Sequence, residues 1–503
     1  MDAVAIVAGL AGSAFAGVRW LRVAQREHYL PGSVSQFAVR WWRTGPNLLL
    51  GLAVVLGIVL AESAPLAAVA GSAALAAGPF GLSLKGRTSP LAWTRRLRTL
   101  ANVWVGLHLA VVAAGAVAGP GATVAALAAA LTPVLIDAAL FLTVPLERRR
   151  IQPFVASATE RLSQVHPTVV AITGSYGKTT TKGYVAHLLA GSRSVVPTPA
   201  SFNNRAGLAR AVNEHLTPGT EVFVAEMGTY GKGEIADLCR WCQPEVAVIC
   251  AIGPVHLERM GSEEAIVEAK SEILEGARVA ILNVDHPLLA RLAGQREAAG
   301  QRVVRCSADA TSSATVVVAD GVVTIDGRAI GSVPRSLGAA PTNVACAVAA
   351  ALEAGAAEES IGERLATLPT APHRLSVSTG QTGATILDDT YNANPAGAAA
   401  ALEALARHAT PDRRRVVVTP GIVELGPRQD EENRRLAAAA AASATHFVVV
   451  GHTNRSALVA GAAGGSAEVV LTETRDEAVA WVREHVVEGD VVLYENDLPD
   501  HFP

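Results

Sequence analysis

The sequence predicts an α/β protein with three parts. These are an α-helical transmembrane region, a central P-loop domain with a mostly parallel sheet, and a Rossmann-like C-terminal α/β domain. Three observations lead to this fold class. Residues 1–150 contain long runs of Ala, Val, Leu and Gly with few charges. A strand-like segment at 169–173 leads into a glycine-rich turn and a helix start. From residue 151 onward, strand-like and helix-like segments alternate, which is typical of parallel sheets covered by helices.

The apolar runs of the first 150 residues have the character of membrane helices, because about 20 apolar residues span a bilayer. We expect the first run to be an anchor rather than a cleaved signal peptide, since Met1 and Asp2 precede it and arginines follow it. The alternative, a soluble helical bundle, needs polar stripes at helical spacing that these runs lack. The first two runs are short, so four or five spans are expected: 3–18, 47–61, 64–84, 100–119 and 122–144.

Basic residues flank alternate ends of these runs and predict their orientation. The connections at 62–63 and 119–121 carry no positive charge. By the positive-inside rule the basic segments are cytoplasmic, which predicts a multi-pass protein of the cell membrane, inner or plasma, with cytoplasmic catalytic domains. The basic residues are Arg19, Arg22, Arg26, Arg40, Arg43, Lys85, Arg87, Arg95, Arg96, Arg98, Arg148, Arg149 and Arg150.

The globular part divides into two predicted domains. The central domain, 151–375, alternates strands and helices and then changes to short β pieces between 315 and 333. There, Asp320-Gly321 and Asp326-Gly327 predict hairpin turns. A second alternating series fills the C-terminal domain, 376–503, which has the size of an ordinary domain.

Composition limits the partners and the redox chemistry. The net charge is −3, which gives no indication of a nucleic-acid partner. All five cysteines lie in the predicted cytosolic part, so we expect reduced thiols. Cys239 and Cys242 have zinc or redox spacing, but no second pair accompanies them, so two cysteines on one helix is the favoured interpretation.

The glycine-rich turn after the strand at 169–173 has the pattern of a phosphate-binding loop, with one residue fewer between its glycines than usual. Small residues let backbone N–H groups converge on phosphate oxygens at a helix N-terminus. Lys178 is expected to reach the outer phosphates of ATP, and the hydroxyl of Thr179 or Thr180 to hold Mg²⁺. An ordinary glycine-rich turn is the alternative. The expected nucleotide-binding residues here are Gly174, Ser175, Tyr176, Gly177, Lys178, Thr179 and Thr180.

Two further residues stand out from their local patterns. Glu226 ends a strand, where the ligand crevice of such sheets lies, so it either holds Mg²⁺ or is simply solvated. Lys270 falls on the apolar face of a helix at 262–276. A buried ammonium is costly, so Lys270 needs a partner or a changed charge, unless its side chain extends to solvent. His256, in a loop after a strand, is unremarkable by itself.

A series of motifs in this part of the chain resembles the Mur ligase family. Its members are ATP-dependent amide ligases of peptidoglycan precursor synthesis. The motifs are most similar to the branch that adds D-alanyl-D-alanine to a UDP-muramoyl tripeptide, and they cover about residues 165–495. They are GSYGKTTT (174–181), SFNNRAG (201–207), AEMGTYGKGEIADL (225–238), HLERMGSEEAIVEAKSEIL (256–274), ILNVDHP (281–287), NVACAVAAA (343–351), PHRL (372–375), DDTYNANP (388–395) and VELG (423–426).

The resemblance assigns roles to individual residues. It implies that Lys178, His256 and Lys270 are catalytic, and that Asn343, Arg374 and Asp389 join the loop in binding ATP. It implies two Mg²⁺ ions, held by Thr179, Glu226, His256 and a carbamylated Lys270. The substrate-binding positions are Asn203, Asn204, Tyr391, Asn392 and Asn394. ATP would phosphorylate a carboxylate, and an amine would attack the acyl phosphate while domain closure excludes water.

Two departures from the family pattern bear on the substrates. Soluble Mur ligases begin with a domain that grips a UDP-sugar, whereas this chain has apolar runs there, which favours a lipid-linked carboxylate at the bilayer. Residues 494–498 (YENDL) stand where the branch carries a Lys-Gly-Ser element, which leaves the amine, an amino acid or dipeptide, open. The alternatives are a poly-γ-glutamate-type synthetase, a membrane transport ATPase and a non-catalytic scaffold.

Overall fold

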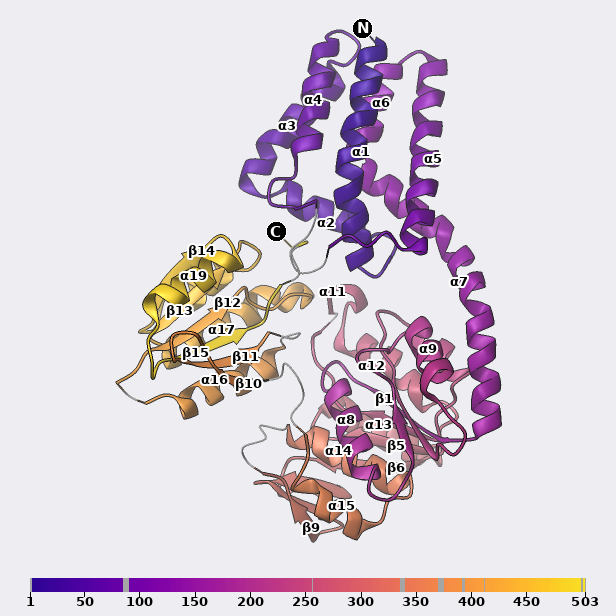
Figure 1. Ribbon diagram of the computed structural model, residues 1–503, viewed down its shortest axis with the longest axis vertical. Helices are drawn as coiled ribbons and strands as arrows, with labels where there is room; N and C mark the ends of the chain where they lie inside the picture. The colour runs from indigo at the N-terminus through magenta and orange to yellow at the C-terminus, as the bar shows by residue number, and fades with distance from the viewer. Residues whose placement is uncertain are drawn as a thin grey trace. The chain divides into compact units, whose positions relative to one another are not determined.

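The computed structural model describes residues 2–84, 90–255, 257–334, 340–369, 375–390, 394–410, 412–498 and 501–502. The chain forms two compact units. The first unit comprises Met1–Arg150 together with Leu498–Pro503, and the second unit comprises Ile151–Asp497. Figure 1 shows helices in the first unit and helices with strands in the second.

The first unit is a bundle of helices with an alanine-rich interior. Helix α1 packs against α4 and α6, and α5 packs against α6 (Figure 1). Its helices are α1 (Asp2–Arg26), α2 (Ser33–Trp42), α3 (Gly45–Val59), α4 (Pro65–Ala77), α5 (Arg95–Ala118), α6 (Gly121–Ala130) and the first part of α7 (Thr132–Val165).

Two of these helices, α1 and α5, are long and apolar enough to cross a membrane. The count rises to four if α2 with α3, and α6 with α7, are each taken as one bent span. These pairs bend by 104° and 72°. Helix α4 has only 13 residues, shorter than the run predicted at 64–84. The expected four or five spans therefore stay a prediction, with α1 and α5 as the candidates that meet the length and composition criteria.

The first helix extends past its predicted end, so that three arginines, Arg19, Arg22 and Arg26, lie within it. Arg19 and Arg22, expected in a basic loop, lie within α1 and are buried. The Arg19 guanidinium donates to the carbonyl oxygens of Ala76 and Gly78, at 2.6 and 3.2 Å, at the C-terminus of α4. Because helix C-termini present unpaired carbonyls with partial negative charge, Arg19 acts as a cap for α4.

A buried carboxylate caps the other kind of helix end, the N-terminus of α2. Asp137 of α7 accepts hydrogen bonds from the backbone N–H groups of Gly32, Val34 and Ser35, at 2.9, 3.3 and 2.8 Å, and also from the Ser35 hydroxyl. These donors belong to the first turn of α2, where N–H groups have no partner within the helix. Asp137 is therefore explained as a helix cap.

The last residues of the chain pack within the first unit, although the sequence placed them in the C-terminal domain. The His501 ring lies 2.8 Å from a Glu27 carboxylate oxygen, and both side chains are buried. The His501 carbonyl accepts from Trp41 Nε1 at 2.9 Å, and the ring centroid lies 4.9 Å from that of Phe37. This polar and aromatic contact joins residues 460 positions apart, which no local pattern reports.

The middle part of the second unit is built on a nine-stranded sheet of order β2-β3-β1-β4-β5-β6-β7-β8-β9. Strands β2 to β7 are parallel, and β8 and β9 continue the sheet antiparallel. Its elements are β1 (Thr168–Thr173), α8 (Lys178–Leu189), β2 (Val195–Pro197), α9 (Arg205–His215), β3 (Val222–Glu226), α10 (Glu234–Cys239), β4 (Val246–Ile249), α11 (Leu257–Met260), α12 (Glu263–Ser271), η1 (Glu272–Leu274), β5 (Val279–Asn283), α13 (Pro287–Ala298), β6 (Arg302–Ser307), β7 (Val316–Ala319), β8 (Val322–Ile325), β9 (Arg328–Ser332), α14 (Pro341–Glu353) and α15 (Glu358–Leu365).

Both faces of this sheet are buried, which explains why its strands read as continuous apolar runs. Val170 and Ile172 of β1 face the core formed with α8, α14 and α15. Val169 and Ala171 face the opposite core, formed with α9, α10, α12 and α13. The two predicted hairpins are confirmed: Asp320-Gly321 joins β7 to β8 and Asp326-Gly327 joins β8 to β9, all with positive φ.

The C-terminal part has a six-stranded sheet of order β10-β11-β15-β12-β13-β14, parallel except for the edge strand β10. Helices α16, α17 and α18 cover one face and α19 covers the other (Figure 1). The predicted α/β class with mostly parallel sheets is thus confirmed. The elements are β10 (Ser376–Thr379), β11 (Thr385–Asp389), α16 (Pro395–His408), β12 (Arg415–Thr419), η3 (Gly426–Arg428), α17 (Gln429–Ser443), β13 (His446–Val450), α18 (Arg455–Ala462), β14 (Glu468–Thr472), α19 (Arg475–His485) and β15 (Val491–Glu495).

The cap formed by Asp137 generates a stability prediction. Asp137→Ala removes the acceptor of three backbone N–H groups at α2, so we expect it to lower the free energy of unfolding by about 1–3 kcal/mol. Ser35→Ala, the matched control, removes only one hydroxyl contact and is expected to cost less than about 1 kcal/mol. Thermal unfolding of the detergent-solubilised full chain measures both, and equal melting temperatures for the two variants contradict the capping role.

Candidate functional site

The phosphate-loop segment lies at the carboxyl end of β1, in the middle of the nine-stranded sheet. Chain connections diverge there, because β1 is paired with β3 on one side and β4 on the other. Ile172 is in register with Glu226, the last residue of β3, and Thr173 with Ile249, the last of β4. Ligands of open α/β sheets bind at such a position. The topology therefore brings the loop, Glu226 and the residues after β4 to one edge.

Two glycines of the loop occupy positions that a side chain cannot. Gly177 has φ +79°, and an added Cβ would lie 2.4 Å from Asn343 Oδ1. An added Cβ on Gly174 would lie 2.6 Å from the sulfur of Cys250. Gly177 thus lets the loop approach Asn343 on α14, and the structure brings together two residues that the resemblance assigned to the nucleotide.

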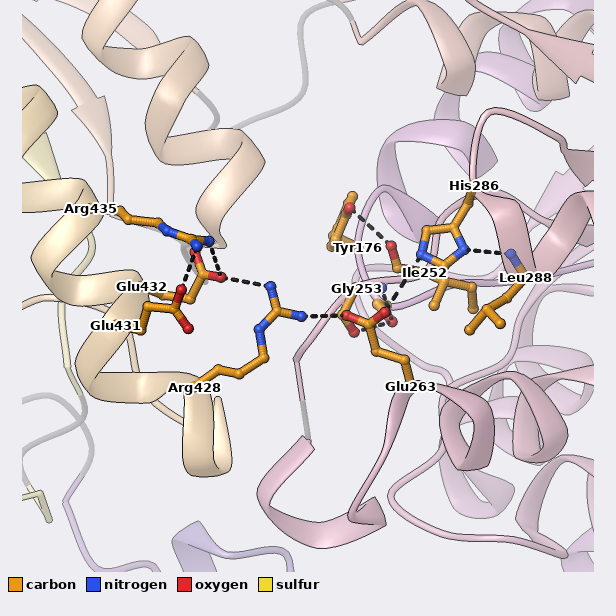
Figure 2. Close-up of polar contacts among 11 residues, drawn as sticks. Tyr176, Ile252, Gly253, Glu263, His286, Leu288, Arg428, Glu431, Glu432 and Arg435 are labelled. Carbon is orange, nitrogen blue, oxygen red and sulfur yellow. Dashed lines mark hydrogen bonds and ion pairs between the residues drawn. The ribbon is translucent and has the colours of Figure 1, made fainter.

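The loop is tied to the segment that follows β4. The Ser175 hydroxyl donates to the Gly253 carbonyl and accepts from the Gly253 N–H, both at 3.1 Å. The Tyr176 hydroxyl donates to the Ile252 carbonyl at 3.1 Å, as Figure 2 shows. Burial raises the pKa of Tyr176, so its hydroxyl stays protonated and remains a donor. Side chains therefore hold the loop in place. The N-terminus of α8, which follows the loop directly, lies at the carboxyl end of β1.

The first turn of α8 carries the residues predicted to contact phosphate. Lys178 Nζ donates to the carbonyl of Gly174 at 2.9 Å, so the ammonium lies over its own loop. Thr179 is an exposed residue, and its hydroxyl donates to Glu226 Oε2 at 2.9 Å. Thr180 is half-buried in the same turn. Of the two threonines considered for Mg²⁺, Thr179 is the one placed beside a carboxylate.

Glu226 is almost fully buried, at 1% exposure, and its two oxygens are well supplied with donors. Oε2 accepts from Thr179 and, at 3.0 Å, from Lys182 Nζ. Oε1 accepts from Asn203 Nδ2 at 3.0 Å. A buried carboxylate needs such partners to stay ionised.

Lys182 is the site residue that the sequence analysis missed. It is 5% exposed, pairs with Glu226 and also donates to the carbonyl of Ala200. A signal was present: Lys182 follows Lys178 by four residues, so both lie on one face of α8.

Lys270 is buried as expected and points at the loop. Its Nζ donates to the carbonyl of Gly174 at 3.0 Å, the same carbonyl that Lys178 contacts. Burial, with the charge of Lys178 as a second cause, lowers the pKa of Lys270 to about 7. A sizeable neutral amine fraction therefore exists at neutral pH.

The remaining predicted residues do not all gather at the phosphate loop. Asn204 and Asn394 use their side-chain oxygens as helix caps, accepting from the N–H groups of Gly207 and Gly397, each at 3.0 Å. Asp389 is buried at the end of β11 and accepts from the N–H of Leu375 at 3.1 Å. The other predicted residues, His256, Arg374, Tyr391 and Asn392, lie outside the described residues.

The donor set suits a hard divalent cation. Glu226 supplies carboxylate oxygens and Thr179 a hydroxyl oxygen 2.9 Å away, which are the ligand types that Mg²⁺ prefers. Across the described ranges no group of three or more His, Cys, Asp and Glu side chains gathers at one point. The phosphate oxygens of a bound nucleotide would add ligands of the same hard type.

Comparisons with known proteins agree with this geometry. The Mur ligase middle domain family matches residues 172–332, and the Mur ligase glutamate ligase domain family matches residues 373–494. The UDP-N-acetylmuramoyl-tripeptide–D-alanyl-D-alanine ligase of Mycobacterium tuberculosis is 35% identical over 368 residues, which cover 65% of this chain and 69% of the relative. The enzyme of that name from Bacillus subtilis is 32% identical over 279 residues, 53% of this chain and 58% of the relative.

Solved structures of the same kind superpose on this chain. The MurF ligase of Thermotoga maritima in complex with ADP has a TM-score of 0.57 at 27% identity, covering 69% of this chain and 80% of that one. MurF from Acinetobacter baumannii has a TM-score of 0.57 at 26% identity, covering 68% and 77%. With both domains matched in order and a relative matched over more than two thirds of its length, the chain belongs to the Mur ligase family of ATP-dependent peptide ligases.

Proposed function

We propose that this Mur-type ligase of peptidoglycan synthesis is membrane-anchored and joins a carboxylate to an amine through an acyl phosphate. One observation carries the proposal: Lys178 and Lys270, from different elements, converge on the Gly174 carbonyl beside the buried Glu226. Lys178 at the phosphate loop, with Lys270 and Glu226 beside it to hold metal ions, suits a reaction in which two anions, a γ-phosphate and a carboxylate, must approach each other.

The chain's own residues have distinct tasks in this reaction. The loop Gly174–Thr180 and Asn343 hold the nucleotide, with Arg374 and Asp389 completing its site. Lys178 leaves the Gly174 carbonyl for the transferred phosphate and stabilises its charge. Asn203, Asn204, Tyr391, Asn392 and Asn394 contact the carboxylate and amine substrates. Because a carboxylate is a poor acylating agent, phosphorylation must precede attack by the amine, which expels phosphate.

Magnesium has a place in this scheme, because Thr179 and Glu226 offer the oxygen ligands that it prefers. Thr179, Glu226 and His256 would hold it, with Lys270 as a carbamate for a second ion. When bound, Mg²⁺ neutralises phosphate charge. A carbamate forms when the lone pair of a neutral Nζ attacks CO₂ and one proton leaves, and the lowered pKa of Lys270 supplies that neutral amine. The product is an anion, which removes the repulsion between Lys270 and Lys178.

The membrane part of the proposal concerns the source of the carboxylate. In this proposal, residues 1–150 form a membrane region, 151–375 the ATP-binding domain and 376–503 the C-terminal domain, except that the last residues pack in the first unit, and the catalytic domains are cytoplasmic. The apolar helices α1 and α5 support this arrangement. A lipid-linked muramoyl peptide presented at the bilayer is the favoured carboxylate, and an amino acid or dipeptide is the amine. The capping role of Asp137 weakens the transport alternative, since the residue already has a structural use.

The substrate class is tested by ADP release from the full chain in lipid nanodiscs. Lipid-linked, UDP-linked and free muramoyl peptides are crossed with amines, including D-alanyl-D-alanine. We expect kcat/KM at least about tenfold higher for a lipid-linked carboxylate, because the bilayer concentrates and orients it. Lys178→Met serves as the inactive blank. Efficient turnover of the UDP-linked peptide with no response to the lipid-linked form contradicts the proposal.

Lys270→Met tests the assignment of this lysine. The variant keeps the bulk and removes the amine, so ADP formation is expected to fall at least about 100-fold. In ¹³CO₂-equilibrated protein, a carbamate carbon signal should be present in the wild type and absent from the variant. Lys232→Met removes an exposed lysine beside the same helix and should retain activity. Full activity of Lys270→Met is the result that rejects the assignment.

Lys182→Met tests the missed ion pair. Removing one partner of a buried pair leaves Glu226 with less compensation, so the free energy of unfolding should fall by about 3 kcal/mol in the presence of a chelator. Mg²⁺ with ATP should restore part of the loss, because a cation near Glu226 replaces the lysine's charge. Lys182→Arg, which keeps the charge, should lose less. Melting curves that are identical for wild type and Lys182→Met, with or without Mg²⁺, speak against this role.

A further inference from the structure

A loop of the C-terminal domain lies against the segment that leads to Lys270. The Glu258 N–H points to the Glu424 carbonyl at 3.5 Å, and Arg259 Nη2 lies 3.5 Å from Glu424 Oε1. Glu424 has φ +64°, a conformation that few residues other than glycine adopt. An added Cβ on Gly426 would lie 3.0 Å from the Glu258 nitrogen. The two backbones are thus in close contact, and a larger residue at 426 would separate them.

An ion pair lies one turn beyond this backbone contact. Arg428 Nη1 donates to Glu263 Oε1 of α12 at 2.7 Å, and Arg428 Nη2 donates to Glu432 Oε1 of α17 at 2.7 Å (Figure 2). One guanidinium, at the N-cap of α17, therefore bridges a carboxylate of α17 and a carboxylate of the middle domain. Arginine is suited to this task because its planar fork directs several N–H groups in fixed directions. Glu432 also accepts from Arg435 at 3.3 Å, which holds it in place.

Glu263 is fixed from the middle-domain side as well. Figure 2 places the His286 ring beside it, with Nε2 3.8 Å from Glu263 Oε2. His286 Nδ1 accepts from the Leu288 N–H at 3.3 Å. Since Nδ1 acts as an acceptor, the ring proton resides on Nε2 and faces the Glu263 carboxylate. The position of Glu263 is therefore set by both domains.

Helix α12 connects this contact to the catalytic loop. Glu263 is its first residue, and Lys270 follows seven residues later, which places both on nearly the same side of the helix. The helix begins at a Ser262 cap that accepts from the Ala265 N–H at 3.1 Å. At its other end, Glu272 accepts from the N–H groups of Gly233 and Ala236. A helix capped and held in this way moves as one body, so a displacement of Glu263 displaces Lys270.

We propose that Arg428 is a positioning residue that couples docking of the C-terminal domain to the placement of Lys270. The inference rests on the proposed function, which makes Lys270 catalytic. With Arg428 engaged on Glu263, α12 holds Lys270 against the phosphate loop. When the domain undocks, the guanidinium leaves and α12 loses that restraint. Phosphoryl transfer is thereby limited to the docked state, in which the acyl phosphate is shielded from water.

The test compares Arg428→Gln, Glu263→Gln and the double variant in the full chain. Docking is measured by the distance between spin labels at Arg291→Cys on α13 and Ala400→Cys on α16, both exposed positions, with a non-hydrolysable ATP analogue as the probe. The native cysteines do not compete for the label, because all five are buried. We expect each single variant to lower the docked fraction, and to raise hydrogen exchange in α12, about three- to tenfold. The double variant should match the singles.

The control is Arg434→Gln, on the helix α17 that Arg428 precedes, because Arg434 pairs only locally with Asp430 among the contacts described for its guanidinium. It should leave the distances unchanged. Arg428→Lys, which keeps the charge without the fork, should recover part of the docked fraction. In turnover, Arg428→Gln should lower kcat while the KM for ATP stays within about twofold, because ATP binding itself does not use this residue.

Several results overturn the coupling. Distances and α12 exchange that equal the wild type in both single variants reject it, as do losses that multiply in the double variant. If the wild type turns over and the Arg428→Gln variant has the same kcat, the coupling is rejected as well. Failure of the proposed function has a different signature, in which the wild type releases no ADP with any substrate pair while the label distances still respond to Arg428→Gln. That outcome supports the docking contact.

Discussion

The burial of three charged side chains at the end of β1 is the constraint on which the second unit depends. Lys182, Lys270 and Glu226 are each at most 5% exposed. An ion removed from water loses several kcal/mol of solvation, so it needs a partner or a shifted pKa. Glu226 lies near its partners on α8 because β3 is adjacent to β1. Lys270 has a hydrogen-bond acceptor because α12 brings its Nζ to the Gly174 carbonyl. The strand order and the site both meet the requirement that buried charged groups have partners.

The same constraint connects the phosphate loop to the C-terminal part of the second unit. Lys270 lies on α12, and its Nζ donates to the Gly174 carbonyl of the loop. Contacts at both ends hold α12, and one of them comes from Arg428 of the C-terminal part. In the proposed coupling, the placement of Lys270 therefore depends on docking of the domain that would shield the acyl phosphate from water.

Local patterns in the sequence predicted the local features well. Continuous apolar strands, the two Asp-Gly turns and the spacing of Gly174, Gly177 and Lys178 each follow from short-range physics, and the structure has them. The contacts of Lys182 with Glu226, and of His501 with Glu27, depend on which distant segments become neighbours. Periodicity contains no information on such pairs. The length of α1 was underestimated because arginines are typical of loops, whereas Arg19 finds its partners at the carbonyls that end α4.

The use made of buried polar groups distinguishes the two units. In the first unit, Asp137 and Arg19 cap helices and Glu27 pairs with His501, so these contacts serve the fold. In the second unit, Lys178 contacts the Gly174 carbonyl of the loop and Thr179 contacts Glu226, at the carboxyl ends of β1 and β3, where a nucleotide can replace those contacts. Exchangeable contacts therefore coincide with the phosphate loop, where the proposed chemistry takes place.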